Sequence, residues 1–327
     1  MRSAQPAVGF IFVTLFLDVL GFGLIIPILP RLIETLAGGN VSDASTIYGA
    51  LAAVYSLMQF VCAPVLGSLS DKFGRRPVIL LSLLGSGLDF ILLALAPSIP
   101  WFFAGRVIAG ITGANFATCT AYIADVSPPE KRAANFGVIG AAFGLGFIAG
   151  PALGGLLGDH GLRLPFVVAA GLTLLNWLYG LLVLPESLSL ENRRAFSWSR
   201  ANPVGSLTAL GRHPVVAGLT WTYFLSTLAH FHLHSIWVLY TGHRYHWSIG
   251  QTGLSLAIVG ITSAIVQGAL GRVVIPKLGE ARTVLLGLFI SAVAFVGYAF
   301  SWEGWIIYIV LAFDSLGGLA GPALQSL

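Results

Sequence analysis

Apolar side chains form long runs along most of the chain, and polar residues gather in the short segments between these runs. The runs last roughly 20 residues and do not alternate with a period of two, so they predict membrane-spanning helices rather than barrel strands. The predicted spans are 7–29, 46–66, 77–96, 101–124, 136–158, 164–184, 214–240, 249–271, 282–300 and 304–325.

The composition agrees with a protein whose solvent is mostly lipid. Of 327 residues, 56% are hydrophobic and 9% are charged, whereas an ordinary soluble domain carries about 25% charged side chains. Because lipid offers no partners for backbone polar groups, we expect an all-α fold, a polytopic membrane helical bundle. The first run carries Asp18 and lacks a small-x-small cleavage site, so we interpret it as a span rather than a signal peptide.

The placement of Lys and Arg predicts which helix ends face the cytoplasm. The N-terminus and the segments after the second, fourth, sixth and eighth spans carry most of the 17 basic residues, so the positive-inside rule makes that side cytoplasmic. The bases on this side are Arg2, Lys72, Arg75, Arg76, Lys131, Arg132, Arg193, Arg194, Arg200, Arg212, Arg272, Lys277 and Arg282. Those on the other side are Arg31, Arg163 and Arg244, and Arg106 lies inside a span.

The longest polar connection divides the chain into two parts. We expect an N-terminal six-helix half at 1–184, a cytoplasmic interdomain loop at 185–213 and a partial C-terminal half at 214–327. A weak similarity between two segments of the chain is consistent with this division, because KFGRR follows the second span and KLGEAR follows the eighth. Parallel six-span halves are one of the repeat plans of secondary transporters.

The segment GSLSDKFGRRP, residues 67–77, concentrates charge in an otherwise apolar chain. We expect a tight cytoplasmic turn, in which Gly67 lets its helix end close against a neighbour and Gly74 supplies a positive φ. Asp71 and the bases Arg75 and Arg76 then sit at headgroup depth, where they can pair with one another, with lipid phosphates or with helix ends. A purely topogenic loop, whose bases only hold the orientation, is the alternative.

Four ionisable side chains fall inside predicted spans: Asp18, Asp89, Arg106 and Asp314. Such residues are costly in hydrocarbon and are candidates for function by default. At ~1.5 Å rise per residue, the first three share a middle-to-outer layer of the N-terminal half. They predict either a structural ion pair of Arg106 with Asp18 or Asp89, or a proton site whose net negative charge suits a cationic or metal-chelated substrate. For Asp314, solvation at a helix end and a functional role both remain open.

Glycines recur every fourth residue in GLGFIAGPALGG, at Gly146, Gly150 and Gly154. This spacing predicts a small-residue face that lets a partner helix approach closely. Pro151 removes a backbone hydrogen bond and is expected to bend the span.

Few other side chains suggest chemistry. Polar candidates for contact with substrate are Gln59, Asn115, His234 and Gln267. His230, His232 and His234 alternate, a spacing that does not favour a metal site, and we expect no metal and no cofactor. The chain lacks the G-x-x-x-x-G-K-[ST] loop of ATP-driven pumps and a nucleophile–base pair of enzyme-like spacing, and its dispersed bases argue against nucleic acid.

Several segments resemble the major facilitator superfamily. The loop G-x-L-x-D-x-x-G-R-R-P is similar to the signature loop of that superfamily, and GLGFIAGPALGG resembles the motif of its drug/proton antiporters. The tetracycline/proton antiporter group is most similar. The segments that carry the resemblance are LDVLGFGLIIPILP at 17–30, SLMQFVCAPVLGSLSDKFGRRPVILLSL at 56–83, GRVIAGITGAN at 105–115 and WVLYTGHRYHW at 237–247.

The resemblance implies roles for individual residues. It assigns Asp71 and its neighbouring bases to a charge network that holds a cytoplasmic gate shut, with Arg132 as a partner. It implies that Asp18, Asp89 and Arg106 are essential, and that the bend at Pro151 seals the antiporter against leak. The fold implied has twelve spans in two halves.

The chain also departs from this family pattern. The ninth span has no acid near Ser291, where the tetracycline antiporters carry an aspartate, and a histidine expected in the eighth span is replaced near Ser263. Both departures bear on the identity of the substrate more than on proton coupling. The chain contains about ten of the twelve expected spans.

The sequence therefore predicts a proton-coupled antiporter that exports a drug-like small molecule, with tetracycline as first candidate, by alternating access. The alternatives are an exporter of a different drug or metabolite, and a truncated remnant that does not transport. We expect a monomer that contacts protons, membrane lipid and a small amphipathic substrate. It is expected in the inner membrane with its N-terminus in the cytoplasm.

Overall fold

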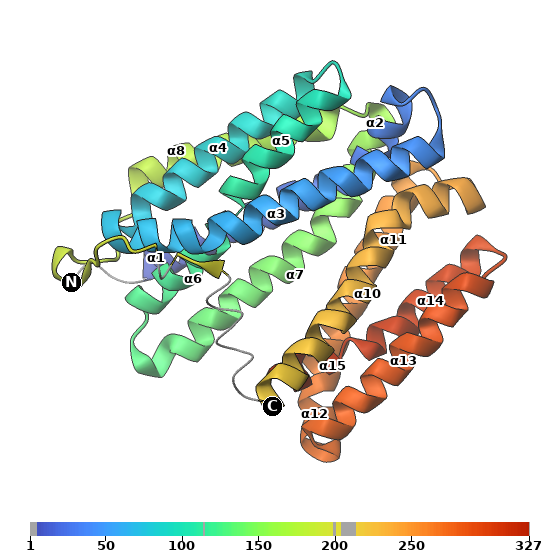
Figure 1. Cartoon of the computed structure of the whole chain (residues 1–327). Coiled ribbons are helices and arrows are strands. Elements are labelled where there is room, and N and C mark those ends of the chain that lie inside the picture. The colour runs from blue at the N-terminus through green and yellow to red at the C-terminus, as the bar shows by residue number, and fades with distance from the viewer. Residues whose placement is uncertain (1–4, 114, 199–200, 204–213, 327) are drawn as a thin grey trace. The chain divides into compact units, whose positions relative to one another are not determined.

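The computed structural model describes residues 5–113, 115–198, 201–203 and 214–326, and every element of regular structure in these ranges is helical (Figure 1). The chain divides into two compact units, unit 1 at 1–207 and unit 2 at 208–327. The division falls inside the polar connection at 185–213.

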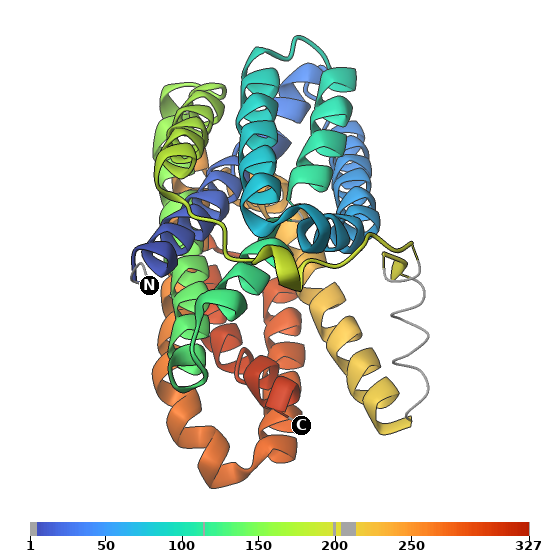
Figure 2. The same cartoon turned by 90° about the vertical axis from the view of Figure 1, so that its left-hand side faces the viewer.

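Unit 1 is a bundle of eight α-helices in its described part. They are α1 (Gln5–Ile25), α2 (Leu29–Leu36), α3 (Val41–Phe73), α4 (Arg75–Leu95), α5 (Ile99–Thr112), α6 (Asn115–Val126), α7 (Pro129–His160) and α8 (Leu164–Val183), followed by the 3-10 turn η1 (Leu190–Asn192). Helix α1 packs against α7 and α8, while α3 packs against α5 and α4 lies between α5 and α8 (Figure 2).

Unit 2 contains α10 (Pro214–Tyr245), α11 (Ile249–Ile265), α12 (Gly271–Leu278), α13 (Glu280–Phe300), α14 (Gly304–Gly317) and α15 (Ala320–Ser326), with the π-helical turn η2 (Val266–Leu270) between α11 and α12. Helix α13 packs against α14 and α15, and α11 packs against α14.

Apolar side chains both fill the core of unit 1 and cover its outer faces. In unit 1, Phe10, Leu15, Leu83 and Tyr122 are buried together between α1, α4 and α6. Large apolar side chains also point outward, and Leu182 is 79% exposed. A soluble protein rarely leaves contiguous apolar surface of this kind in water, so these faces suit hydrocarbon.

Each of the ten predicted spans coincides with helix in the described residues, and seven helical segments are long and apolar enough to cross a membrane. The remaining three predicted spans differ for local reasons. Helix α10 carries several His and hydroxyl side chains, and the spans at 249–271 and 304–325 are divided by η2 and by the turn at Gly318. Divided spans of this kind are common where transporters build polar sites.

Two more predicted spans are interrupted. The first helix ends at Ile25 and α2 begins at Leu29, with Pro27, which lacks a backbone N–H, in the turn between them. The fourth span is described as two helices, because α5 ends at Thr112 and α6 begins at Asn115, while residue 114 lies outside the described part of the chain.

Candidate functional site

A buried ion pair joins α4 and α5 in the interior of unit 1. Nη2 of Arg106 lies 3.6 Å from Oδ2 of Asp89, and the two residues are 7% and 1% exposed. Gly105 leaves room for this pair, because a Cβ there would lie 2.7 Å from Oδ1 of Asp89. Of the two partners expected for Arg106, the structure thus selects Asp89.

Asp18 has a different partner. Asn115, the first residue of α6, donates a hydrogen bond from Nδ2 to Oδ2 of Asp18 over 3.3 Å. The oxygen of the same amide lies 3.7 Å from Sγ of Cys119, which orients it. The carboxylate of Asp18 therefore faces a neutral amide from α6 rather than a guanidinium.

Tyr55 and Gln59 connect these groups from α3. The Tyr55 ring lies 5.9 Å from Cζ of Arg106, a distance at which a guanidinium is attracted to an aromatic face. Gln59 donates from Nε2 to the Tyr55 hydroxyl and to the carbonyl of Gly113, each over 3.3 Å. The embedded charge site thus comprises Asp18, Tyr55, Gln59, Asp89, Arg106 and Asn115.

Sequence reasoning named five of these six residues and missed Tyr55. Its position one helical turn before Gln59, on the same face of α3, was the available signal. The close contact of α3 with α5 depends on Gly110, since a Cβ there would lie 2.6 Å from the carbonyl oxygen of Tyr55.

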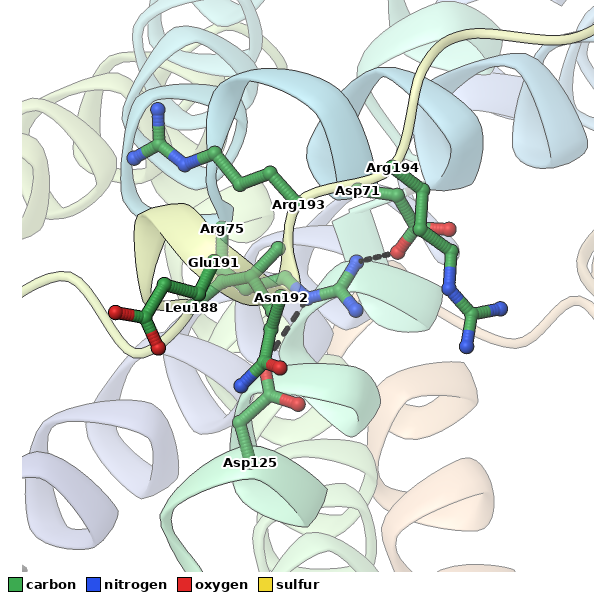
Figure 3. A pocket seen from close by; sticks show the side chains of 8 residues that line it. All are labelled: Asp71, Arg75, Asp125, Leu188, Glu191, Asn192, Arg193 and Arg194. Atoms are coloured by element: carbon green, nitrogen blue, oxygen red, sulfur yellow. Dashed lines mark hydrogen bonds and ion pairs between the residues drawn. The ribbon is translucent and has the colours of Figure 1, made fainter.

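A second polar cluster surrounds Arg75 at the end of unit 1 where α3 meets α4. Its guanidinium contacts Oδ1 of Asp71 at 2.6 Å, Oγ of Ser70 at 2.6 Å and Oδ2 of Asp125 at 3.1 Å. These contacts join α3, α4 and α6. They border a cavity of about 510 Å³ that is also lined by Leu188, Glu191, Asn192, Arg193 and Arg194 (Figure 3).

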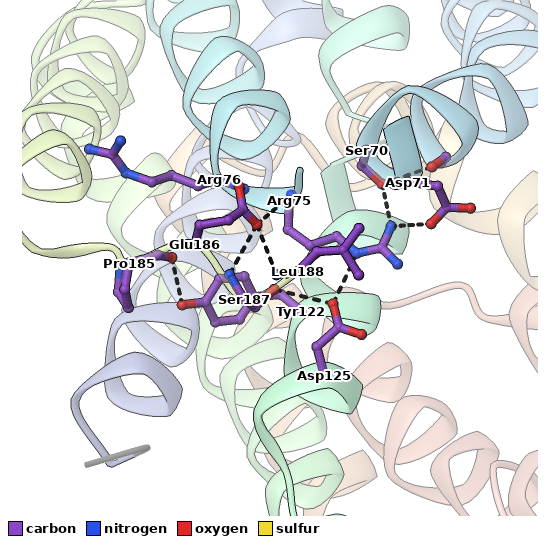
Figure 4. A network of polar contacts seen from close by, with 11 residues as sticks. Ser70, Asp71, Arg75, Arg76, Tyr122, Asp125, Pro185, Glu186, Ser187 and Leu188 are labelled. Atoms are coloured by element: carbon purple, nitrogen blue, oxygen red, sulfur yellow. Dashed lines mark hydrogen bonds and ion pairs between the residues drawn. The ribbon is translucent and has the colours of Figure 1, made fainter. Parts of the chain in front are cut away.

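Glu186 extends this cluster to the segment that follows α8. We term the cluster of Ser70, Asp71, Arg75, Asp125 and Glu186 the loop network. The Glu186 carboxylate accepts from the backbone N–H of Arg75 at 2.8 Å and of Arg76 at 3.3 Å (Figure 4). The Tyr122 hydroxyl donates to the carbonyl of Pro185 over 2.9 Å. Sequence reasoning assigned no role to Glu186 or Asp125, although both are acids next to predicted cytoplasmic bases.

The structure agrees with the prediction for some of the expected gate residues and differs for others. Gly74 has φ +106°, as predicted, and it separates α3 from α4 by itself. The close approach predicted at Gly67 is not seen in the described residues, because no atom lies within 4 Å of a Cβ built there and α3 continues to Phe73. The side chain of Arg132 lies outside the described part of the chain.

The predicted glycine face of α7 lies directly against α1. A Cβ at Gly146 would lie 2.9 Å from the carbonyl oxygen of Phe16, and one at Gly150 would lie 2.7 Å from Cα of Gly23. A Cβ at Gly154 would overlap the carbonyl of Leu24. Pro151 lies inside α7 beside Gly23, where a Cβ would come within 2.8 Å of the proline ring.

Unit 2 holds the remaining predicted residues. Gln267 lies in η2, and a Cβ built at Gly318, where α14 ends, would be 3.3 Å from its Nε2. Ser291, on α13, lies with its Oγ 3.4 Å from Nε2 of His230. The side chain of His234 lies outside the described part of the chain.

Comparisons with known proteins identify the family. The model of the Major Facilitator Superfamily matches residues 11–327. The chain is 40% identical to the tetracycline resistance protein, class C, of Escherichia coli over 314 residues, which are 96% of this chain and 78% of that protein.

Two solved structures share the fold. The crystal structure of the human organic anion transporter MFSD10 (TETRAN) matches with TM-score 0.74 and 29% identity, covering 100% of this chain and 86% of that one. A bacterial homologue of the human lysosomal transporter Spinster matches with TM-score 0.81 at 16% identity, covering 100% and 75%. The chain is a multi-pass membrane protein that belongs to the major facilitator superfamily of transporters.

Proposed function

We propose that this protein is a proton-coupled exporter of a small amphipathic, drug-like molecule, with tetracycline as the first candidate. The similarity to tetracycline resistance proteins supports the class of substrate. In this proposal the protein lies in the inner membrane with its N-terminus in the cytoplasm and works by alternating access of its two halves.

The observation that carries the proposal is the unequal pairing of the two acids in the embedded charge site. Arg106 is paired with Asp89, whereas Asp18 contacts the amide of Asn115. Two acids and one base leave one negative charge, and an ionised carboxylate is costly in a medium of low dielectric constant. We assign this negative charge to Asp18. It is neutralised either by the uptake of one proton or by the binding of a cationic or metal-chelated substrate.

Movement of the substrate would then be coupled to the Arg106–Asp89 pair. A substrate that draws Arg106 away from Asp89 leaves the second carboxylate unpaired and ready to take a proton. Tyr55 lies next to Arg106, and Gln59 is hydrogen-bonded to Tyr55. The two residues are proposed to supply a ring face and an amide for contact with an amphipathic molecule. Gln267 in unit 2 is proposed as a further contact.

The loop network is proposed as the cytoplasmic gate. Its partly exposed ion pairs between Arg75 and the acids Asp71 and Asp125 each stabilise the closed gate by no more than about 1 kcal/mol. Weak pairs suit a gate that opens and closes in every transport cycle. A loop that only fixes the orientation in the membrane would not need contacts from α6 and the segment after α8.

A second candidate function is the export of a different compound, such as an organic anion. Ser291 stands where the resemblance to tetracycline antiporters implies an acid, so unit 2 lacks that negative charge. The chain is also similar in fold and sequence to a human organic anion transporter. The two candidates differ in substrate and share the embedded charge site.

Expression of this chain in a drug-sensitive bacterium tests the proposal. We expect resistance to tetracycline, and we expect Asp18→Asn and Asp89→Asn each to abolish it. The control is Asp43→Asn, which removes an exposed carboxylate in the first turn of α3. Resistance that survives both embedded substitutions would rule out the proton role, and resistance to organic anions alone would favour the second candidate.

A further inference from the structure

Unit 2 contains an embedded His–Asp pair that has no part in the site described above. Nε2 of His230, on α10, lies 3.9 Å from Oδ1 of Asp314, on α14. The side chain of Asp314 is 12% exposed and that of His230 is 33% exposed. We propose that this pair is a second proton-binding site, which carries one proton per transport cycle through the C-terminal unit.

The hydrogen bonds of His230 show which of its atoms accepts the proton. Nδ1 lies 2.8 Å from the carbonyl oxygen of Ser226, one turn earlier on α10. A carbonyl oxygen only accepts, so Nδ1 carries the hydrogen of the neutral ring. The lone pair is then on Nε2, which faces Ser291 Oγ at 3.4 Å and the Asp314 carboxylate.

The surroundings of Asp314 make its negative charge costly. The residue lies in the last turn of α14, where the helix dipole disfavours an anion. The Tyr298 hydroxyl donates to Oδ2 over 3.1 Å, while the buried Oδ1 accepts no hydrogen bond from the described residues. It is this oxygen that faces the lone pair on Nε2, an arrangement that is repulsive until a proton enters between them.

No fixed cation offsets this charge in the described side chains of unit 2. Arg244 lies in the last turn of α10 and Lys277 in the last turn of α12, while Arg282 lies in the first turn of α13. Among the described side chains, Tyr298 from α13 is a titratable group that contacts the pair, through its hydrogen bond to Asp314. One proton taken from water changes the pair from net charge −1 to 0, and its return to water restores the charge.

The role in transport rests on the proposed proton-coupled function, but proton binding itself can be tested without transport. The seven histidines of the protein are labelled with ¹⁵N, and the ring signal that is absent in His230→Gln is followed with pH. We expect the chemical shift of this signal to change with pH, as binding of a proton at Nε2 requires. Its titration should change in Asp314→Asn and stay unchanged in the control His232→Gln, which lies two residues away on α10. A His230 signal that does not titrate, or that is indifferent to Asp314, would overturn the proposal.

Proteoliposomes then test the coupling. Each coupled proton raises accumulation driven by a one-unit pH gradient about tenfold. We expect substrate accumulation to be about tenfold lower in His230→Gln and in Asp314→Asn than in the wild type. Both variants should still exchange substrate in the absence of a gradient. We expect Asp314→Glu to restore the accumulation. Accumulation equal to wild type in both variants would refute a coupling role. If the wild type shows no proton-driven transport while His230 titrates as expected, the proposed function fails and the proton-binding site stands.

Discussion

Glu186 caps the helix that begins at Arg75, although the two residues are 111 positions apart in the sequence. The N-cap position of α4 is Gly74, which has no side chain to accept hydrogen bonds from the first turn. The carboxylate of Glu186 takes that role and also accepts from the N–H groups of Ser187 and Leu188. A negative charge at a helix N-terminus is favourable, so this contact fixes the segment after α8 to the start of α4.

Replacing Glu186 tests the strength of this cap. We expect Glu186→Ala to destabilise unit 1 by about 1 kcal/mol, the typical cost of losing an N-cap acceptor. The measurement is the thermal unfolding midpoint in detergent. The matched control is Glu191→Ala in η1, an exposed acid of the same segment. Equal destabilisation by both substitutions would contradict a specific cap.

Two Gly→Ala substitutions in α7 are expected to change the free energy of unfolding in opposite directions. Gly150→Ala places a Cβ 2.7 Å from Cα of Gly23, where the backbone of α1 cannot yield easily, and we expect a loss of about 1–3 kcal/mol. Gly144→Ala meets no atom within 4 Å, so we expect a gain of about 0.5–1 kcal/mol from the lower entropy of the unfolded chain. Thermal unfolding of the two variants checks both signs, and a stable Gly150→Ala variant would refute the close contact.

The Arg106–Asp89 pair predicts a rescue of stability without a rescue of transport. Arg106→Gln leaves a buried carboxylate without its cation, which costs about 3–5 kcal/mol. The double variant Arg106→Gln/Asp89→Asn has neither charge, so it should unfold at a higher temperature than Arg106→Gln alone. Both should fail to confer resistance. Additive effects of the two substitutions on stability would show that the side chains do not interact.

The loop network distinguishes two neighbouring arginines. Arg75 contacts three side chains on two other helices, a geometry that needs the guanidinium fork. In the described part of the chain, the Arg76 guanidinium donates from Nη2 to one carbonyl, that of Leu181. We therefore expect Arg75→Lys to lower both the unfolding midpoint and the transport rate, and Arg76→Lys to change them little. A larger effect of Arg76→Lys would argue against Arg75 as the centre of the network.

The sequence by itself determined the properties that depend on neighbouring residues. Runs of apolar residues long enough to cross a bilayer fix helices there, because each helix satisfies its own backbone in lipid. The positive φ at Gly74 and the glycine face of α7 could also be predicted, since turn chemistry and i, i+4 spacing are local. The ionisable residues of the spans stood out for the same reason, because their cost in hydrocarbon does not depend on their partners.

Only the tertiary structure decided which polar groups meet. Each residue turns a helix by about 100°, so the partner of a side chain depends on how two helices are rotated and packed against each other. That rotation pairs Arg106 with Asp89 and directs Asp18 to Asn115. The same packing brings His230 to Asp314 across 84 positions, a distance in sequence at which no local pattern signals a contact.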